Sequence, residues 1–172
     1  MDVVPGHKRS KMMSGIRGGN TRPEMMVRRL LFRAGYRYRL HFKGLPGRPD
    51  IVMPGRKIAI FVHGCFWHCH ENCRYFRIPS SNTEFWRGKL SSNVERDRKT
   101  CTLLAGAGWR VLTVWECSTR SEEALQSLKG YLEKWLEGSR RLGEWPGAGR
   151  KSQVTGFLPS RVATADPSCL AR

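Results

Sequence analysis

Residues 47–73 constrain the fold of this chain most, because they place reactive side chains at the ends of two apolar segments. The stretch reads GRPDIVMPGRKIAIFVHGCFWHCHENC and holds three of the five histidines and three of the six cysteines. Two apolar runs, 51–53 and 57–62, flank a Pro-Gly pair, and this pattern predicts a β-hairpin. Asp50 begins the first run, and imidazoles and thiols follow the second. These donor atoms favour metal binding over core packing.

The rest of the chain alternates helical and extended patterns around this hairpin. Thr21 and Glu24 form a capping box, with Pro23 in the first turn, and Gly35 ends the helix that follows. The predicted elements are helices at 21–34, 83–105 and 121–137 and strands at 36–42, 51–53, 57–62 and 109–115. This order predicts an α/β fold with a small mixed central sheet flanked by helices.

Length and charge narrow the class of protein. The 172 residues are enough for one domain with a core and too few for two comfortable ones. The chain carries 31 Lys+Arg against 14 Asp+Glu, a formal charge of +17. Basic residues dominate residues 1–42, and Arg28, Arg29 and Arg33 are expected on the polar face of the first helix. Together with 10% aromatic residues, this favours a nucleic acid over a membrane as partner.

Composition also divides the chain. Residues 1–20 are expected to form a basic DNA-binding arm, residues 21–138 the folded domain, and residues 139–172, rich in Gly, Pro, Ser and Arg, a disordered tail outside the fold. No apolar run is long enough for a signal peptide or a membrane span, so we expect a soluble, intracellular protein. In a reducing compartment, cysteines clustered with histidines favour metal ligation over disulfides.

Five motifs together resemble the very short patch repair (Vsr) endonucleases. They are GRPD at 47–50, FVHGCFWH at 61–68, TEFW at 83–86, NVERDR at 93–98 and GWRVLTVWEC at 108–117. The resemblance runs from about residue 9 to 137 and implies a restriction-endonuclease-like fold for the endonuclease domain. It implies Mg²⁺-dependent nicking of one DNA strand beside a T:G mismatch, which arises when 5-methylcytosine deaminates. It further implies a bacterial cytoplasmic monomer, associated with the nucleoid when on DNA, with mismatch-repair proteins as candidate partners.

The resemblance also implies catalytic roles. Asp50 and the main-chain carbonyl of Val62 are the expected Mg²⁺ ligands, and His68 is the expected general base. A cation offsets charge that develops on the phosphodiester, and an imidazole accepts a proton near neutral pH. The remaining active-site residues implied by the family are His63, Asn93, Asp97 and Glu24.

The sequence leaves alternatives open for several of these residues. Asp50 could pair with Arg48, and the capping box alone accounts for Glu24. Asp97 could pair with a neighbouring arginine on its helix. Val62 departs from the family pattern, in which a hydroxyl residue is common at this position. A carbonyl ligand survives that change, whereas a role for the hydroxyl does not.

A second, structural metal site is implied at Cys65, His70, Cys73 and Cys117. Four N and S ligands in a tetrahedron are typical of structural zinc. Cys69 lies between these positions and could replace one of them. An iron–sulfur cluster on Cys65, Cys69 and Cys73, with Cys117 as fourth ligand, and simple buried thiols are the alternatives.

Aromatic residues of the motifs match the family's DNA-intercalating side chains. The implied DNA contacts are Phe66, Trp67 and Trp86, with Met13 in the opposite groove and Lys89 near the mispaired bases. A T:G pair stacks less well than its neighbours, so a wedge separates it at lower cost. Core packing is the alternative for these residues, and it applies most to Trp86, which begins an amphipathic helix.

Two other functions remain open at this level. A zinc-stabilised DNA-binding protein without catalysis would account for the charge and the cysteines, but it gives no reason for Asp50 and His68. A restriction-type nuclease that cuts both strands shares the catalytic residues and differs only in its substrate.

Overall fold

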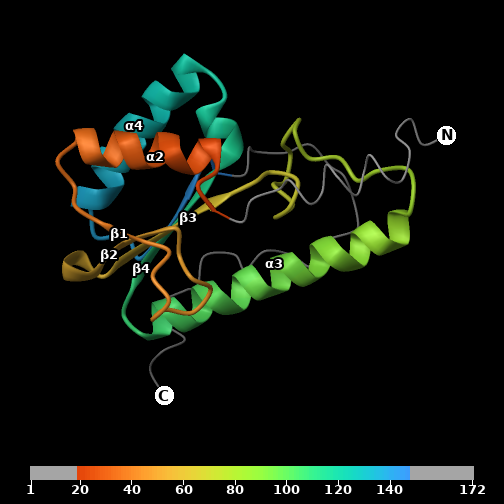
Figure 1. Cartoon of the computed structure of the whole chain (residues 1–172), viewed down its shortest axis with the longest axis horizontal. Helices are drawn as coiled ribbons and strands as arrows, with labels where there is room; N and C mark the ends of the chain where they lie inside the picture. The colour runs from red at the N-terminus through yellow and green to blue at the C-terminus, as the bar shows by residue number, and fades with distance from the viewer. Residues whose placement is uncertain (1–18, 148–172) are drawn as a thin grey trace.

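A five-stranded mixed sheet forms the centre of the protein in a computed structural model that describes residues 19–147. The strands are Arg39–Leu40 (β1), Ile51–Met53 (β2), Ile58–His63 (β3), Arg110–Trp115 (β4) and Leu142–Trp145 (β5), and the helices are Arg22–Arg33 (α2), Thr83–Gly106 (α3) and Glu122–Glu137 (α4). Helices α2 and α4 cover one face of the sheet and α3 runs along the other (Figure 1). The predicted α/β class with a mixed sheet is confirmed.

The sheet order is β1-β2-β3-β4-β5. Strands β1, β2 and β3 pair antiparallel, and β3, β4 and β5 pair parallel. The predicted hairpin is therefore present, and a 3₁₀ turn at Pro54–Arg56 closes it. A parallel β3–β4 pair needs a crossover connection, which α3 supplies across one face of the sheet.

Side chains cap the starts of α2 and α4, and the capping box of α2 was predicted. The Thr21 side chain accepts a hydrogen bond from the Glu24 N–H, and the Glu24 carboxylate accepts one from the Thr21 N–H, so the capping box is present. Ser121 caps α4 by accepting from the Ala124 N–H at 3.2 Å. These bonds satisfy N–H groups that have no partner within the helix.

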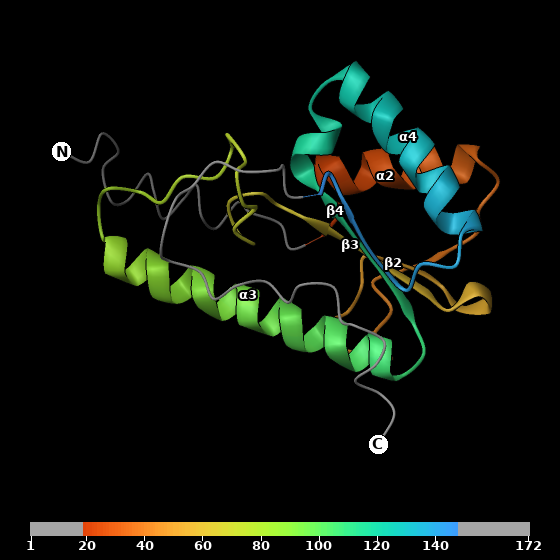
Figure 2. The ribbon, with the colours of Figure 1, turned by 180° about the vertical axis from the view of Figure 1, so that it is seen from behind.

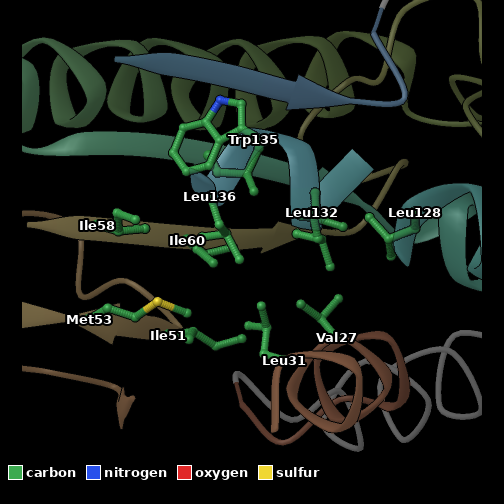
Figure 3. Close-up of a cluster of buried hydrophobic side chains, with 12 residues drawn as sticks. Val27, Leu31, Ile51, Met53, Ile58, Ile60, Leu128, Leu132, Trp135 and Leu136 are labelled. Atoms are coloured by element: carbon green, nitrogen blue, oxygen red, sulfur yellow. The ribbon is translucent and has the colours of Figure 1, made fainter. Parts of the chain in front are cut away.

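Two hydrophobic clusters pack the helices onto the sheet. Alternate residues of β3 point to opposite faces, so Ile58 and Ile60 face α2 and α4 whereas Ala59 and Phe61 pack with Leu104 of α3. The larger cluster contains Val27, Leu31, Ile51, Met53, Ile58, Ile60, Leu112, Val114, Leu128, Leu132, Trp135 and Leu136 (Figure 3). Packing on both faces fixes the ends of β2 and β3, from which the candidate site is built.

The folded part extends beyond the predicted boundary at residue 138. Strand β5 pairs with β4, with Val111 opposite Leu142, and Figure 2 shows it beside β4. Trp115 Nε1 donates to Glu144 Oε1 at 2.6 Å. Gly143 lies against the Trp135 indole so closely that a Cβ would be 2.2 Å from Nε1. Expecting residues 142–145 outside the fold was therefore wrong.

Two other expectations change in extent or fall outside the description. The strand expected at 36–42 reduces to Arg39–Leu40. The expected arm up to residue 18, Met13 within it, and residues 148–172 of the expected tail lie outside the described residues. Within the described part of the chain, no helix is long and apolar enough to cross a membrane.

Candidate active site and metal centre

The candidate site lies where β3 ends and β2 begins. Asp50 immediately precedes β2, and the Val62 N–H near the end of β3 donates to its Oδ2 at 2.7 Å. Burial raises the pKa of Asp50 to about 6, although the hydrogen bond from Val62 opposes this shift. Among the described residues, Asp50 makes no ion pair with Arg48. The carboxyl is thus held in place and poorly solvated, which suits a group that exchanges its proton for a cation.

Glu24 brings a second carboxylate to this point. The side chain is buried in the first turn of α2 and has ligand-capable atoms within 4.8 Å of those of His41 and Asp50. One carboxylate can therefore complete the capping box and face Asp50, so these two roles are compatible. His41 was missed by sequence analysis, because it reaches the cluster through the pairing of β1 with β2, beyond which its N–H donates to the Asp50 carbonyl at 3.2 Å.

Arg28 differs from its predicted position on the polar face of the helix. It is 6% exposed, and its guanidinium forms an ion pair with Glu24 one turn earlier. A buried arginine requires such a partner, because an uncompensated charge is strongly unfavourable away from water. Arg28 is buried because Glu24 provides a buried carboxylate one turn away. Helical spacing alone did not predict this burial.

A second cluster contains His63, His68 and Asp97. The His68 Nδ1 lies 2.6 Å from Asp97 Oδ2, and the rings of His63 and His68 stack with centroids 3.8 Å apart. An ionised Asp97 accepts a hydrogen bond from Nδ1–H, which leaves His68 Nε2 as the proton-accepting atom. Asp97 thus orients an imidazole, and its arginine neighbours bond elsewhere, with Arg98 on Glu95 at 2.9 Å.

Asn93 lies one turn before Asp97 on α3 and supports the same loop. Its Nδ2 donates to the Trp67 carbonyl at 2.9 Å, and Arg96 donates to its Oδ1. The side chain is buried. The two α3 residues therefore fix the main chain and the side chain of the segment that carries His68.

The four expected zinc positions come together at the end of the sheet. Ligand atoms of Cys65, His70, Cys73 and Cys117 all lie within 4.8 Å of one another. His70 Nδ1 is 3.6 Å from Cys65 Sγ and 3.5 Å from Cys117 Sγ. Cys69 is buried but is not one of the residues of this cluster. The replacement of a ligand by Cys69 and the iron–sulfur alternative both require its thiol there.

The donor set and its surroundings fit a soft divalent metal. Three thiols and one imidazole are typical of closed, tetrahedral zinc sites. A hydrogen bond with the Cys117 thiol, together with burial, raises the pKa of Cys65 to about 12, so the metal-free thiol holds its proton. The His70 ring stacks on Trp115 at 4.2 Å, and the Cys65 N–H donates to Glu116 at 3.3 Å. Sequence analysis did not identify Glu116, which carries no metal-ligand motif.

The predicted DNA-contacting aromatics gather next to these clusters. Phe66 lies 5.1 Å from Trp67 and 5.3 Å from Trp86 between ring centroids, and Phe85 joins Trp86 at 5.4 Å. None of the four belongs to either hydrophobic core cluster, and Phe85 is 64% exposed. Core packing therefore does not account for them. Lys89 follows on the exposed surface of α3, and Phe85 is an aromatic that sequence analysis did not select.

These features define the class of protein. Paired carboxylates and a carboxylate-oriented imidazole on the α/β scaffold of a strongly basic chain are typical of a nuclease. Figure 1 shows segment 64–82 (yellow-green) at the end of the sheet where β3 finishes. This segment carries His68 and three of the four expected zinc positions, so the imidazole cluster and the cysteine cluster share one region.

Comparison with known proteins identifies the family. A family model described as DNA mismatch endonuclease Vsr matches residues 1–74. The chain is 44% identical over 139 residues to DNA mismatch endonuclease Vsr of Escherichia coli (strain K12), which covers 80% of this chain and 88% of that protein. It is 46% identical over 126 residues to type II nicking enzyme V.XorIIP of Xanthomonas oryzae pv. oryzae, covering 73% and 92% of the two chains. The chain therefore belongs to the Vsr family of DNA mismatch endonucleases and is a hydrolase that acts on DNA.

Proposed function

We propose that this endonuclease nicks one strand of double-stranded DNA beside a T:G mismatch, with Mg²⁺ as catalytic ion and Zn²⁺ as structural ion. One observation carries the proposal: two consecutive residues of β3 join the carboxylate cluster to the base. Val62 donates to Asp50, and the next residue, His63, stacks on His68. The group that holds a cation and the group that accepts a proton thus share one rigid strand end.

Asp50 is the proposed anchor for Mg²⁺, with Glu24 beside it and the Val62 carbonyl as a further oxygen donor. Mg²⁺ prefers oxygen ligands, which fits this donor set. When bound, the ion supplies positive charge that offsets charge on the phosphate oxygens. The chain's own contribution is to hold two carboxylates together in a poorly solvated site before the ion arrives.

His68 is the proposed general base. Asp97 accepts the Nδ1 proton at 2.6 Å, so Nε2 is left to take the proton of the attacking water. His63 holds the ring plane of His68 by stacking, and Asn93 fixes the main chain at Trp67. These contacts limit rotation of the imidazole. A general base with a fixed ring stays within hydrogen-bonding distance of its substrate.

Zn²⁺ at Cys65, His70, Cys73 and Cys117 is proposed to order the loop that carries the base. Ligands from both ends of residues 65–73, together with one from the turn after β4, would close this loop. Phe66, Trp67 and His68 lie inside it, so metal binding and placement of these residues are coupled.

Recognition of the mismatch is proposed to use Phe66, Trp67 and Trp86 as a wedge beside the weakly stacked T:G pair, with Lys89 near the mispaired bases and Met13 entering from the opposite groove. The support is that the three rings are partly exposed and form one cluster outside the core. We further propose a restriction-endonuclease-like fold, a monomeric enzyme and mismatch-repair proteins as partners.

A nicking assay tests the proposal. Duplexes that differ only by one T:G pair are labelled on each strand in turn and incubated with and without Mg²⁺. We expect cleavage of one strand of the T:G duplex only, and only with Mg²⁺. Cleavage of both strands of either duplex would instead support a restriction-type nuclease.

A further inference from the structure

Arg28 makes an unusual set of contacts for a residue in the middle of a helix that covers one face of the sheet. The guanidinium is almost fully buried, with Nη2 donating to Glu24 Oε1 and Nη1 donating to Asn20 Oδ1 at 2.7 Å. Nη2 also lies 2.9 Å from His41 Nε2. Arginine stays protonated at any ordinary pH, so a hydrogen bond between this pair runs from the guanidinium to the imidazole.

These contacts join the candidate active site to the segment that enters α2. Asn20 directly precedes the capping box, and Gly19 before it packs on His41, where a Cβ would lie 3.0 Å from Cε1. Glu24, which accepts from Arg28, also has a carboxylate oxygen within 4.8 Å of one of Asp50. One planar guanidinium therefore fixes both an asparagine outside the helix and a carboxylate of the site, since its donors diverge at set angles.

Arg28 also reduces the electrostatic repulsion between Glu24 and Asp50. Glu24 and Asp50 are two carboxylates that lie close together in a partly desolvated region and repel each other when ionised. Arg28 offsets this repulsion, because its buried guanidinium forms an ion pair with Glu24. The carboxylate can then keep its orientation toward Asp50 whether or not a cation is present.

We propose that Arg28 is a positioning residue for the nicking reaction, which holds Glu24 against Asp50 and is itself held by Asn20 at the entrance to α2. This inference rests on the proposed role of Asp50 and Glu24 in holding Mg²⁺. It assigns Asn20 an effect on the nicking rate although Asn20 lies outside the cluster of carboxylates. Substitution of a residue that orients a metal ligand typically lowers metal affinity or activity by about 10–100-fold.

Asn20→Gly provides the cleanest test, because it changes no charge and because glycine tolerates the left-handed backbone at this position, φ 57°. We expect the single-turnover nicking rate on a T:G duplex to fall about tenfold, with duplex affinity measured without divalent ions unchanged within about twofold. Asn20→Asp keeps an acceptor for Arg28 and should restore the rate. An unaltered rate in Asn20→Gly, or no rescue by aspartate, would overturn the proposal.

Metal-induced stabilisation supplies a readout that does not depend on activity. Mg²⁺ raises the melting temperature of a protein that binds it only when folded. The increase should be smaller in Asn20→Gly than in the wild type and should return in Asn20→Asp. Equal increases in all three proteins would contradict the positioning role.

Arg28→Met and Arg29→Met form a matched pair on adjacent positions, one buried and one exposed. We expect the first to lower the nicking rate by about 10–100-fold and the second to weaken binding to matched and T:G duplexes alike. If Arg28→Met does not fold, the Asn20 variants decide. Failure of the wild type to nick T:G duplexes would refute the proposed function, while the Mg²⁺ melting experiment would still decide the positioning role.

Discussion

Ionisation of Asp50 opposes folding of the metal-free protein. Burial raises its pKa from 3.8 to about 6. A carboxyl with a raised folded-state pKa contributes stability that is fully present below pH 3.8 and is lost as the pH rises through about 6. At about 1.4 kcal/mol per pKa unit, the free energy of unfolding loses about 3 kcal/mol from this group by neutral pH.

Asp50→Asn removes this pH dependence, because the amide stays neutral and its Oδ1 can still accept the Val62 N–H. The assay is urea unfolding of both proteins in Mg²⁺-free buffer without chelator, so that the proposed zinc ion would not be withdrawn. Between pH 4 and 7.5, the wild type should lose about 2 kcal/mol or more relative to the variant. Groups that titrate in both proteins and lie away from Asp50 cancel in this comparison.

Two controls make the result specific. Mg²⁺ added at pH 7.5 should stabilise the wild type much more than Asp50→Asn, since the variant lacks the carboxylate proposed to anchor the ion. In the comparison with Glu95→Gln, the wild type should instead gain stability relative to the variant as the pH rises, because a hydrogen bond from Arg98 lowers the pKa of Glu95. Wild type and Asp50→Asn curves that stay parallel across this pH range would refute the account of a desolvated carboxylate.

Three substitutions test other parts of the site. Asp97→Asn replaces a charged hydrogen bond worth about 1.5–3 kcal/mol, so the single-turnover nicking rate should fall by about 10–100-fold; a rate within twofold would mean that Asp97 does not orient His68. Cys65→Ser should lower the melting temperature much more than Cys69→Ser, and equal losses would argue against the four-ligand cluster. Trp67→Ala should weaken T:G binding by about 1–3 kcal/mol and matched binding far less; equal weakening of both would indicate a structural role.

Elements specified by local chemistry were predicted from the sequence. The capping box of α2, the Pro-Gly hairpin and the amphipathic patterns of α3 and α4 depend on residues within one or two turns of each other. Strand β5 depends instead on distant partners, because Gly143 fits beneath Trp135 and Glu144 accepts from Trp115. A four-residue LGEW segment among Gly, Ser and Arg carries no such information by itself.

The candidate site divides in the same way. The expected ligands and bases lie in motifs, and their roles stay predictions. The structure brings together the four positions expected for zinc, His68 with His63 and Asp97, and Asp50 with Glu24. The burial of Arg28, the approach of His41 to Asp50 and the support of the Cys65 loop by Glu116 were not predicted. Each of these depends on how separate elements pack, which helical or strand periodicity does not encode.

The central claim is that Asp50 serves catalysis and not DNA recognition, so Asp50→Ala tests it most directly. Single-turnover nicking of a T:G duplex in Mg²⁺ is measured beside the affinity of the same variant for T:G and matched duplexes. We predict that nicking is abolished while T:G affinity stays within about tenfold of the wild type, because a metal ligand is lost and a DNA contact is not. Nicking at the wild-type rate would contradict the account.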